Sequence, residues 1–284
     1  MSEVFPVVSI CIPTYNGAKY IAQTIQSVLD QSISEFEIII SDDGSTDRTL
    51  EIVRSFSDPR ITRIESLSKV GAEANWNNSV AHARSNLIKL VCQDDLLFKD
   101  CLKIEVALMT DAANKDVAFC YHLRDFVTPN GRFIKGSRLG NKGSKKFSKE
   151  AILKKIVRSG GNPIGEPMAV TFRKSAFELA GQFAGDYVID LDMWSRLLNS
   201  GGALFIEKRL SAFRISKTSW TSSLAQSQFS SVFELSKKLR QQNPQSISQV
   251  DLIRGFAIGL IRTPVRQISS TLILFADRFF RSAR

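Results

Sequence analysis

Residues 36–47 read FEIIISDDGSTD, and this stretch decides the fold. A mostly apolar run, 36–40, passes directly into a polar turn that contains Gly44. A short apolar run bounded by turn residues predicts a buried strand. The same pattern occurs at 7–16 (VVSICIPTYN) and 87–97 (LIKLVCQDDLL), while helical spacing of apolar residues fills 18–31, 46–56 and 72–84. Strands that alternate with helices predict an α/β fold with a parallel sheet and right-handed crossovers.

Acidic residues gather where the predicted segments end. The three groups are Asp42-Asp43, Asp94-Asp95, and Asp190 with Asp192. One acidic pair after a strand is more often a solvated turn than a site. Two pairs after parallel strands meet at one sheet edge, where their charges repel unless a cation lies between them. Mg²⁺ and Mn²⁺ are usually held by carboxylates together with substrate phosphates, so the pattern favours a nucleoside diphosphate and a divalent metal.

Five motifs together resemble family 2 glycosyltransferases. They are VSICIPTYN (8–16), ISDDGSTD (40–47), QDDLL (93–97), GEP (165–167) and DLDMWSR (190–196). Their order and spacing agree with that family over about residues 5–220. The resemblance implies an α/β GT-A fold, a Rossmann-like mixed sheet flanked by helices. It also implies an enzyme of hexosyltransferase type that uses a nucleotide-sugar donor, usually with inversion.

The resemblance also implies residue roles. Asp190 matches the general base and Asp192 a supporting acid, while Asp95 matches the ligand of an Mg or Mn divalent cation. Glu166 and Trp220 are expected on the acceptor side. The residues expected around the nucleotide are Pro13, Tyr15, Asn16, Asp42, Asp43, Asp94 and Arg214.

The chemistry needs these residue types. A metal held by carboxylate stabilises the charge that develops on a departing diphosphate. A carboxylate base takes the proton of the attacking hydroxyl on the opposite face of the sugar. The sequence departs from the family pattern twice, with Cys92 and Gln93 where relatives often carry acid, and with Arg214-Ile215-Ser216 in place of Arg-x-His.

The remaining segments suit the second half of such a fold. Strands are expected at 117–122, 168–172, 203–206 and 210–213, a hairpin turns at 129–131, and 135–149 reads as a loop. Ser148 is expected to cap a helix through Val157. We therefore expect a nucleotide-sugar-binding half at 1–115, an acceptor-binding half at 116–224 and a C-terminal helical tail at 225–284.

The tail is basic and amphipathic. Residues 225–284 carry nine Lys or Arg and three acidic residues. The difference, +6, is more than half of the net charge of +10. Two apolar helical faces are expected around Ile253–Ile261 and Ile268–Phe279, separated by Pro264. Such helices bind anionic membrane surfaces, so residues 250–284 are a candidate segment for binding an anionic membrane surface. Packing on the catalytic domain or in a dimer is the other interpretation.

Composition limits the possible metal sites, cellular compartments and binding partners. Only His82 and His122 are present, which excludes a multi-histidine metal site. Four cysteines without a C-x-x-C pair, and an N-terminus without a basic start, predict a protein of the cytoplasm, peripheral on the cytoplasmic face of the membrane if the tail binds there. No motif supports nucleic-acid binding, despite the pI of about 9.6.

The sequence therefore predicts an inverting glycosyltransferase. It would move a sugar from a nucleoside-diphosphate donor, with UDP or dTDP favoured, to a hydroxyl of a glycan or lipid-linked acceptor in surface polysaccharide synthesis. Two alternatives stay open here. One is an inactive GT-A-like binding protein. The other is a sugar-phosphate nucleotidyltransferase, which would want a Gly-rich basic loop after the first strand.

Overall fold

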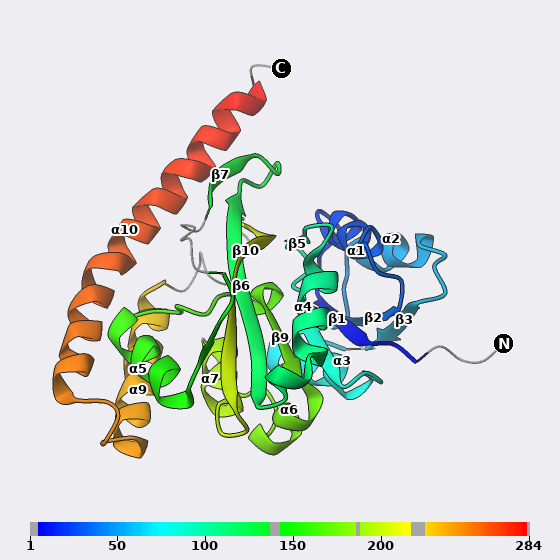
Figure 1. Ribbon diagram of the computed structural model, residues 1–284. Helices are drawn as coiled ribbons and strands as arrows, with labels where there is room; N and C mark the ends of the chain where they lie inside the picture. The colour runs from blue at the N-terminus through cyan, green and yellow to red at the C-terminus, as the bar shows by residue number, and fades with distance from the viewer. Residues whose placement is uncertain (1–4, 67, 137–142, 186–187, 217–224, 283–284) are drawn as a thin grey trace.

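The computed structural model describes residues 5–66, 68–136, 143–185, 188–216 and 225–282, and they form a mixed α/β architecture around one sheet (Figure 1). The strands are β1 (Val8–Thr14), β2 (Phe36–Asp42), β3 (Ile61–Glu65), β4 (Leu87–Leu90), β5 (Leu96–Leu97), β6 (Val117–Val127), β7 (Phe133–Gly136), β8 (Lys145–Phe147), β9 (Val170–Arg173) and β10 (Gly202–Arg214). The helices are α1 (Ile21–Leu29), α2 (Thr49–Ser55), α3 (Ala72–Ala81), α4 (Cys101–Thr110), α5 (Lys149–Ser159), α6 (Lys174–Ala180), α7 (Ile189–Leu197), α9 (Ala225–Gln242) and α10 (Gln249–Ser282).

The strand order is β3-β2-β1-β4-β9-β6-β10-β5. Strands β1 to β4 pair in parallel, as the sequence predicts. β9 is antiparallel to both β4 and β6, so the whole sheet is mixed, as the GT-A resemblance implied. The chain order reverses between β1 and β4, and at such a switch point the loops diverge and leave a crevice for a ligand. The segments after β1, β2 and β4 all reach this crevice.

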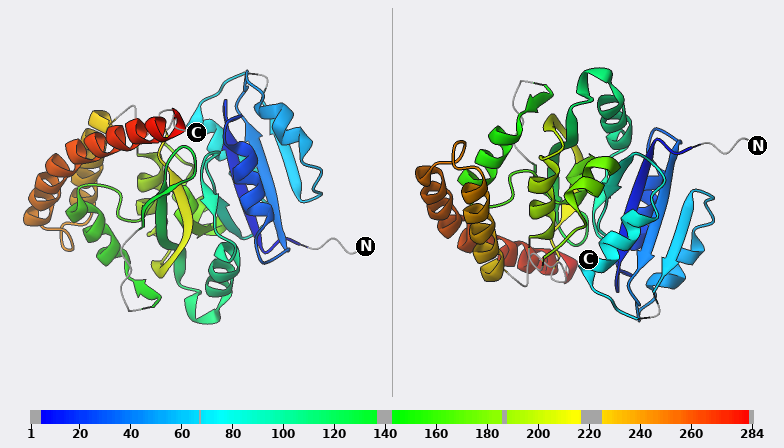
Figure 2. Two further views of the ribbon diagram at one scale, coloured as in Figure 1. Left: turned by 90° about the horizontal axis from the view of Figure 1, so that it is seen from above. Right: turned by 90° about the horizontal axis from the view of Figure 1, so that it is seen from below.

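The core lies on both faces of the sheet. Along β2, Ile38 and Ile40 join one apolar cluster, and Ile39 between them joins the cluster on the opposite face. Neighbouring strand residues point to opposite faces, so a strand covered on both sides must be apolar at every such position. Figure 2 shows helices on both sides of the sheet. This explains why 38–40 is an unbroken apolar run without the alternation of a half-exposed strand.

Three local predictions were wrong. Segments 203–206 and 210–213 are one strand, β10, because register shifts near Ile206 and Arg209 absorb the polar residues between them while pairing with β6 continues. Lys145–Phe147, inside the expected 135–149 loop, forms β8 by pairing with β10. Pro264 does not divide the tail, because α10 continues through it and a proline removes only one helical hydrogen bond.

Other local predictions are confirmed. The Ser148 side chain accepts a hydrogen bond from Ala151 N at 3.3 Å and caps α5. Strands β6 and β7 form the expected hairpin, with Val127 opposite Phe133.

The tail packs against the end of α5. A Cβ atom on Gly255 would lie 1.8 Å from the carbonyl oxygen of Val157, and one on Gly160 would lie 2.2 Å from that of Gly255. α10 and the end of α5 therefore touch backbone to backbone. In Figures 1 and 2, α10 begins on the side of the molecule opposite β1–β3 and runs past β7 toward the middle of the molecule. No described helix combines the length and the apolar composition needed to cross a bilayer.

Candidate active site

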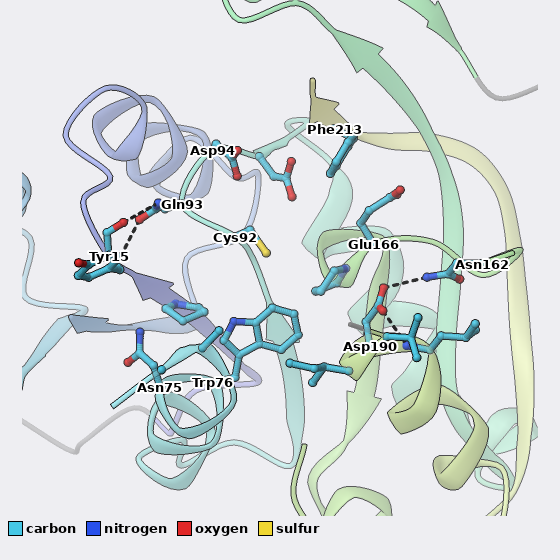
Figure 3. A pocket seen from close by; sticks show the side chains of 18 of the residues that line it. Tyr15, Asn75, Trp76, Cys92, Gln93, Asp94, Asn162, Glu166, Asp190 and Phe213 are labelled. Carbon is cyan, nitrogen blue, oxygen red and sulfur yellow. Dashed lines mark hydrogen bonds between the residues drawn. The ribbon is translucent and has the colours of Figure 1, made fainter. Parts of the chain in front are cut away.

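A cavity of about 460 Å³ opens at the carboxyl ends of β1, β2 and β4. Its wall contains Asp43, Asp95 and Asp190, which are far apart in the sequence. Figure 3 shows Tyr15 and Gln93 on one side, Asp190 and Asn162 on the other, and Trp76 between them. Of the residues expected at the site, those that line this cavity are Pro13, Tyr15, Asp43, Asp94, Asp95, Glu166 and Asp190.

The first end of the cavity is built by the loops after β1 and β2. Asp43 is 2% exposed, and its carboxylate accepts hydrogen bonds from Val70 N at 2.6 Å and Gly71 N at 3.0 Å. Each carboxylate oxygen has a second lone-pair direction, so Asp43 can still accept a hydrogen bond from a nucleobase N–H. The ammonium of Lys69 lies 4.2 Å from the centre of the Tyr15 ring. Lys69 places positive charge here that the sequence analysis did not single out.

Asp42 and Asn16 do not line the cavity. The Asp42 carboxylate accepts from the Ser45 backbone N at 2.8 Å and from the Ser45 hydroxyl at 2.5 Å, which closes the turn after β2. Asn16 Oδ1 accepts from Thr46 N at 2.8 Å and joins the same turn to the β1 loop. Both side chains therefore shape the loops that carry Tyr15 and Asp43.

Gln93 ties the β4 loop to the β1 loop. Its Oε1 accepts from the Thr14 hydroxyl at 2.6 Å and from Tyr15 N at 2.9 Å, and its Nε2 donates to Tyr15 O at 3.0 Å. A Cβ atom on Gly17 would lie 2.3 Å from Gln93 Oε1, so this contact requires glycine at 17. The amide thus supports the nucleotide-side loops at a position where relatives often carry acid.

The Asp94-Asp95 pair is arranged to receive a cation. Burial raises the pKa of Asp94, and burial together with the charges of Asp94 and Glu166 raises the pKa of Asp95 well above its ordinary value. Asp95 is 1% exposed, and its Oδ2 has no hydrogen-bond partner among the described residues. A buried carboxylate oxygen without a donor is costly unless a cation binds it. The residues present therefore fit a hard divalent cation beside Asp95.

Arg214 lies behind that pair and outside the cavity wall. Its guanidinium donates to Asp94 O at 2.9 Å, Pro129 O at 3.0 Å and Gln23 Oε1 at 2.7 Å. Its backbone N donates to Asp95 Oδ1 at 3.3 Å. The side chain is fully buried, so what the structure shows is that Arg214 holds the Asp94-Asp95 turn in place through these hydrogen bonds. Contact with a diphosphate stays a prediction.

Asp190 lies in the first turn of α7, at the opposite end of the cavity. Its Oδ2 accepts from Asn162 Nδ2 at 2.8 Å, and its Oδ1 accepts from Leu191 N at 2.8 Å. Burial raises the pKa of Asp190 from 3.8 to about 6, against the lowering effect of that backbone hydrogen bond. A carboxylate with a pKa just below neutrality is ionised at pH 7 and still accepts a proton readily, which suits a general base.

Asn162 was not predicted as a site residue, and it fixes this base. Its Oδ1 accepts from Ile164 N at 3.1 Å and Gly165 N at 2.9 Å, while its Nδ2 donates to Gly165 O at 3.0 Å as well as to Asp190. These bonds determine which way the amide faces. The sequence signal was the turn Gly160-Gly161-Asn162-Pro163 after an amphipathic helix, which by itself reads as a loop.

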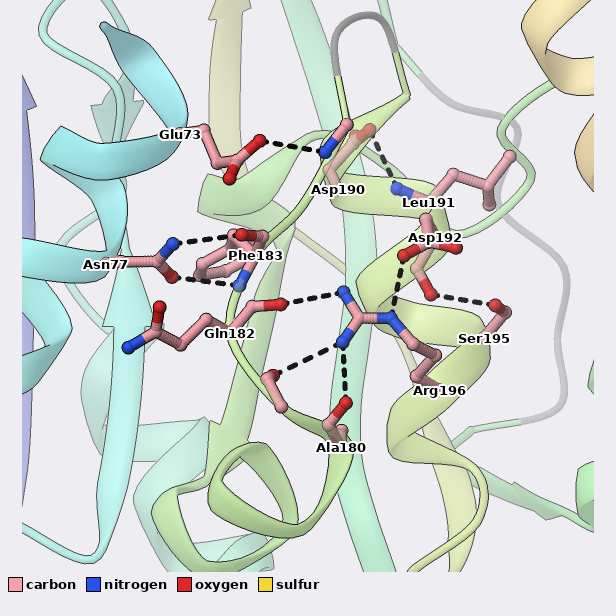
Figure 4. A network of polar contacts seen from close by, with 12 residues as sticks. Glu73, Asn77, Ala180, Gln182, Phe183, Asp190, Leu191, Asp192, Ser195 and Arg196 are labelled. Carbon is pink, nitrogen blue, oxygen red and sulfur yellow. Dashed lines mark hydrogen bonds and ion pairs between the residues drawn. The ribbon is translucent and has the colours of Figure 1, made fainter. Parts of the chain in front are cut away.

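Asp192 points away from the cavity wall and pairs with Arg196. Arg196 Nε donates to Asp192 Oδ2 at 2.7 Å, and the same guanidinium donates to Ala180 O at 2.6 Å and Gln182 O at 2.9 Å (Figure 4). The pair thus holds the segment before α7. A direct acid role for Asp192 stays a prediction.

Of the two residues expected on the acceptor side, the structure describes one. Glu166 lines the cavity and forms an ion pair with Arg124. Trp220 lies outside the described residues. Three apolar or small side chains from the tail complete this end of the cavity, Phe229 and Val232 of α9 and Thr263 of α10. No local motif in the tail predicts that these residues line the site.

A second group of possible metal ligands lies in the core and does not line the cavity. One ligand atom each from Cys101, Glu105 and His122 lies within 4.8 Å of the others. The Lys89 ammonium already donates to Glu105 Oε1 at 2.9 Å, with both side chains fully buried. Burial lowers the pKa of His122 to about 4, so this ring is neutral. Because the ammonium takes the cation's position, this group does not fit a metal.

Comparisons with known proteins agree with the fold. The chain is 29% identical over 131 residues to the Escherichia coli enzyme named UDP-Glc:alpha-D-GlcNAc-diphosphoundecaprenol beta-1,3-glucosyltransferase WfgD, covering 45% of this chain and 51% of that one. The match thus spans about half of that relative's length.

Solved structures show the same architecture. S. aureus TarS in complex with UDP-GlcNAc superposes with a TM-score of 0.66 at 19% identity, covering 89% of this chain and 71% of that chain. The mannosyltransferase PcManGT from Pyrobaculum calidifontis, in complex with GDP-Man and Mn2+, gives 0.64 at 16% identity, covering 96% and 75%.

The family model described as glycosyl transferase family 2 matches residues 9–179. This range includes the β1, β2 and β4 loops and the turn that holds Asn162, and it covers more than half of the chain. The nucleotidyltransferase and inactive-protein alternatives are therefore set aside. The chain belongs to glycosyl transferase family 2 and is a glycosyltransferase with a GT-A fold.

Proposed function

We propose that this enzyme transfers a sugar, with inversion, from a nucleoside-diphosphate sugar to a hydroxyl of a glycan or lipid-linked acceptor in surface polysaccharide synthesis. UDP or dTDP is the favoured nucleotide. The observation that carries the proposal is that Asp43, Asp95 and Asp190 line one cavity. A relative named for a UDP-Glc donor and a diphosphoundecaprenol acceptor supports the substrate classes.

The donor is expected at the end formed by the β1, β2 and β4 loops. Pro13 and Tyr15 would contact the nucleoside, and Asp43 would accept a hydrogen bond from the ring N–H that uracil and thymine both carry. Asp94 would face the ribose, with Asp95 holding Mg²⁺ or Mn²⁺. When bound, that cation supplies Lewis-acid stabilisation of the diphosphate. A structural neighbour solved with GDP-Man and Mn2+ supports the use of a metal.

The acceptor is expected between Glu166 and Asp190. The Asp190 carboxylate takes the proton of the acceptor hydroxyl as its oxygen forms a bond to the anomeric carbon. The bond from that carbon to the diphosphate breaks, and its electron pair leaves with the diphosphate. Attack from the face opposite the leaving group inverts the carbon, so Asp190 has to lie across the cavity from Asp95.

The decisive experiment is Asp190→Asn. It should lower transfer by at least about a hundredfold, since a general base contributes about 10²–10⁴-fold. The shift in melting temperature on adding UDP with Mn²⁺ should stay near that of the unsubstituted enzyme, because Asp190 lies at the other end of the cavity. Transfer that survives the substitution would reject Asp190 as the base.

The positive charge of the tail suggests where in the cell the enzyme works. We include in the proposal that residues 250–284 hold the enzyme on the cytoplasmic face of an anionic membrane. A lipid-linked acceptor would be presented at such a surface.

A further inference from the structure

The α10 helix exposes an apolar surface to solvent. Eight of its large apolar side chains are 51–72% exposed. At about 100° per residue they fall within an arc of about 140°, and at 1.5 Å per residue they extend over about 38 Å. We call these residues the α10 outer face: Val250, Ile253, Leu260, Ile261, Val265, Ile268, Leu272 and Phe275.

The opposite face of α10 is the one that packs on the protein. Leu252 is buried there, and Gly255 and Gly259 contact the end of α5 and Phe229. Near the other end of the helix, Asn130 Nδ2 donates to Asp277 Oδ2 at 2.8 Å and joins α10 to the β6–β7 turn. An ordinary surface helix turns its apolar face inward, so this arrangement is reversed. An apolar surface of this extent marks an interaction site.

Charge determines which kind of partner fits. Arg254 and Arg262 are exposed, Arg254 within the arc of the outer face and Arg262 about 60° beyond its edge, and the sequence adds Arg266, Arg278 and Arg281 on the same helix. A symmetric dimer through this face would place the positive charges of both copies in one interface, without acidic residues of the outer face to offset them. Anionic lipid headgroups offset those charges instead, while the acyl boundary accepts the apolar side chains.

We propose that the α10 outer face docks into the interface of an anionic lipid bilayer, with the helix axis along the surface. The same helix contributes Thr263 to the acceptor end of the cavity, beside Phe229 and Val232. Docking therefore brings the acceptor end toward the lipid and favours an acceptor that is carried by a lipid. This inference deepens the membrane attachment included in the proposed function by naming the face that docks, and the point about the substrate class rests on the proposed transfer reaction.

The test uses the full chain and two single substitutions. Leu260→Asp places a charge in the outer face, and Leu179→Asp makes the same change at an exposed leucine on α6. Cosedimentation is measured with phosphatidylcholine vesicles, with and without phosphatidylglycerol. We expect binding that depends on phosphatidylglycerol, weakened at least about tenfold by Leu260→Asp and unchanged by Leu179→Asp.

Two results would overturn the proposal. One is a native chain that stays in the supernatant with anionic vesicles, or a Leu260→Asp variant that binds as the native chain does. The other is a dimer in sedimentation velocity that Leu260→Asp dissociates, without vesicle binding, which would assign the face to a second copy. Hydrolysis of UDP-sugar in the same samples reports the proposed function separately, and we expect Leu260→Asp to leave it unchanged.

Discussion

Asn162 offers the sharpest test of how this chain sets its catalytic base. Replacing it with alanine removes the donor that lies 2.8 Å from Asp190 Oδ2 and leaves the Leu191 N bond to the other oxygen. A hydrogen bond to a charged group is worth about 1.5–3 kcal/mol, which corresponds to about 1–2 pKa units. From a starting pKa of about 6, the variant's Asp190 should titrate roughly between 7 and 8.

The expected activity follows from ionisation. At pH 7 the ionised fraction of Asp190 falls from about nine-tenths to between about one half and one tenth, so transfer falls about 2- to 10-fold. The loss should be recovered as the pH rises to about 9, because the carboxylate is then ionised again. The assay is the pH dependence of kcat/KM for transfer, with the donor KM measured at each end of the range.

Asn77 supplies the matched control. Its amide makes the same kind of clamp, donating to Phe183 O at 2.9 Å and accepting from Phe183 N at 2.8 Å, with no carboxylate partner. Asn77→Ala should lower the free energy of unfolding by a similar amount and leave the pH dependence of kcat/KM unchanged. The reasoning fails if Asn162→Ala loses the same factor at every pH, or if both variants shift the profile equally.

Three further predictions concern the charged groups. Because the raised pKa of Asp190 makes the native state bind its proton more tightly than the unfolded chain does, stability should fall as the pH rises from about 4 to 6. Asp190→Asn should remove that slope and raise the free energy of unfolding above pH 7 by about 1–2 kcal/mol, after allowance for solvent in the cavity; a free energy of unfolding that is unchanged at both ends of the pH range would contradict it. Asp95→Asn should abolish the extra thermal stabilisation that Mn²⁺ adds to UDP while preserving the shift with UDP alone, and an undiminished Mn²⁺ effect would exclude Asp95 as the ligand. Lys89→Met should destabilise the fold by about 3–5 kcal/mol in urea titration, since it leaves Glu105 buried without its cation; Lys89→Met with Glu105→Leu should recover most of that loss, and failure to do so would show that packing dominates.

Much of the nucleotide side could be predicted from sequence. Its residues follow directly on strands that are recognisable as short apolar runs, and Tyr15, Asp43 and Asp95 lie within a few residues of those strand ends. The sheet topology then makes these ends meet. Where local signals are weaker the predictions were wrong: bulges let β10 pass through Lys208, and pairing with β10 turned 145–147 into a strand.

The acceptor side depended on contacts between distant segments. Asn162 looks like any loop asparagine until the chain brings Gly165 and Asp190 within hydrogen-bond distance. Phe229 and Thr263 read as ordinary positions of amphipathic helices, and only the packing of α10 on the end of α5 places them in the cavity wall.

By itself, the sequence determined the order of strands and helices over the first hundred residues, the family, and the acidic residues that follow the strands. Those properties follow from apolar periodicity and from motifs within single segments, which need no knowledge of distant neighbours. Only the tertiary structure decided which carboxylates have donors, whose pKa is raised, and which face of α10 remains uncovered. Each of these is set by desolvation and by partners from elsewhere in the chain, and such pairings exist only after the chain has folded.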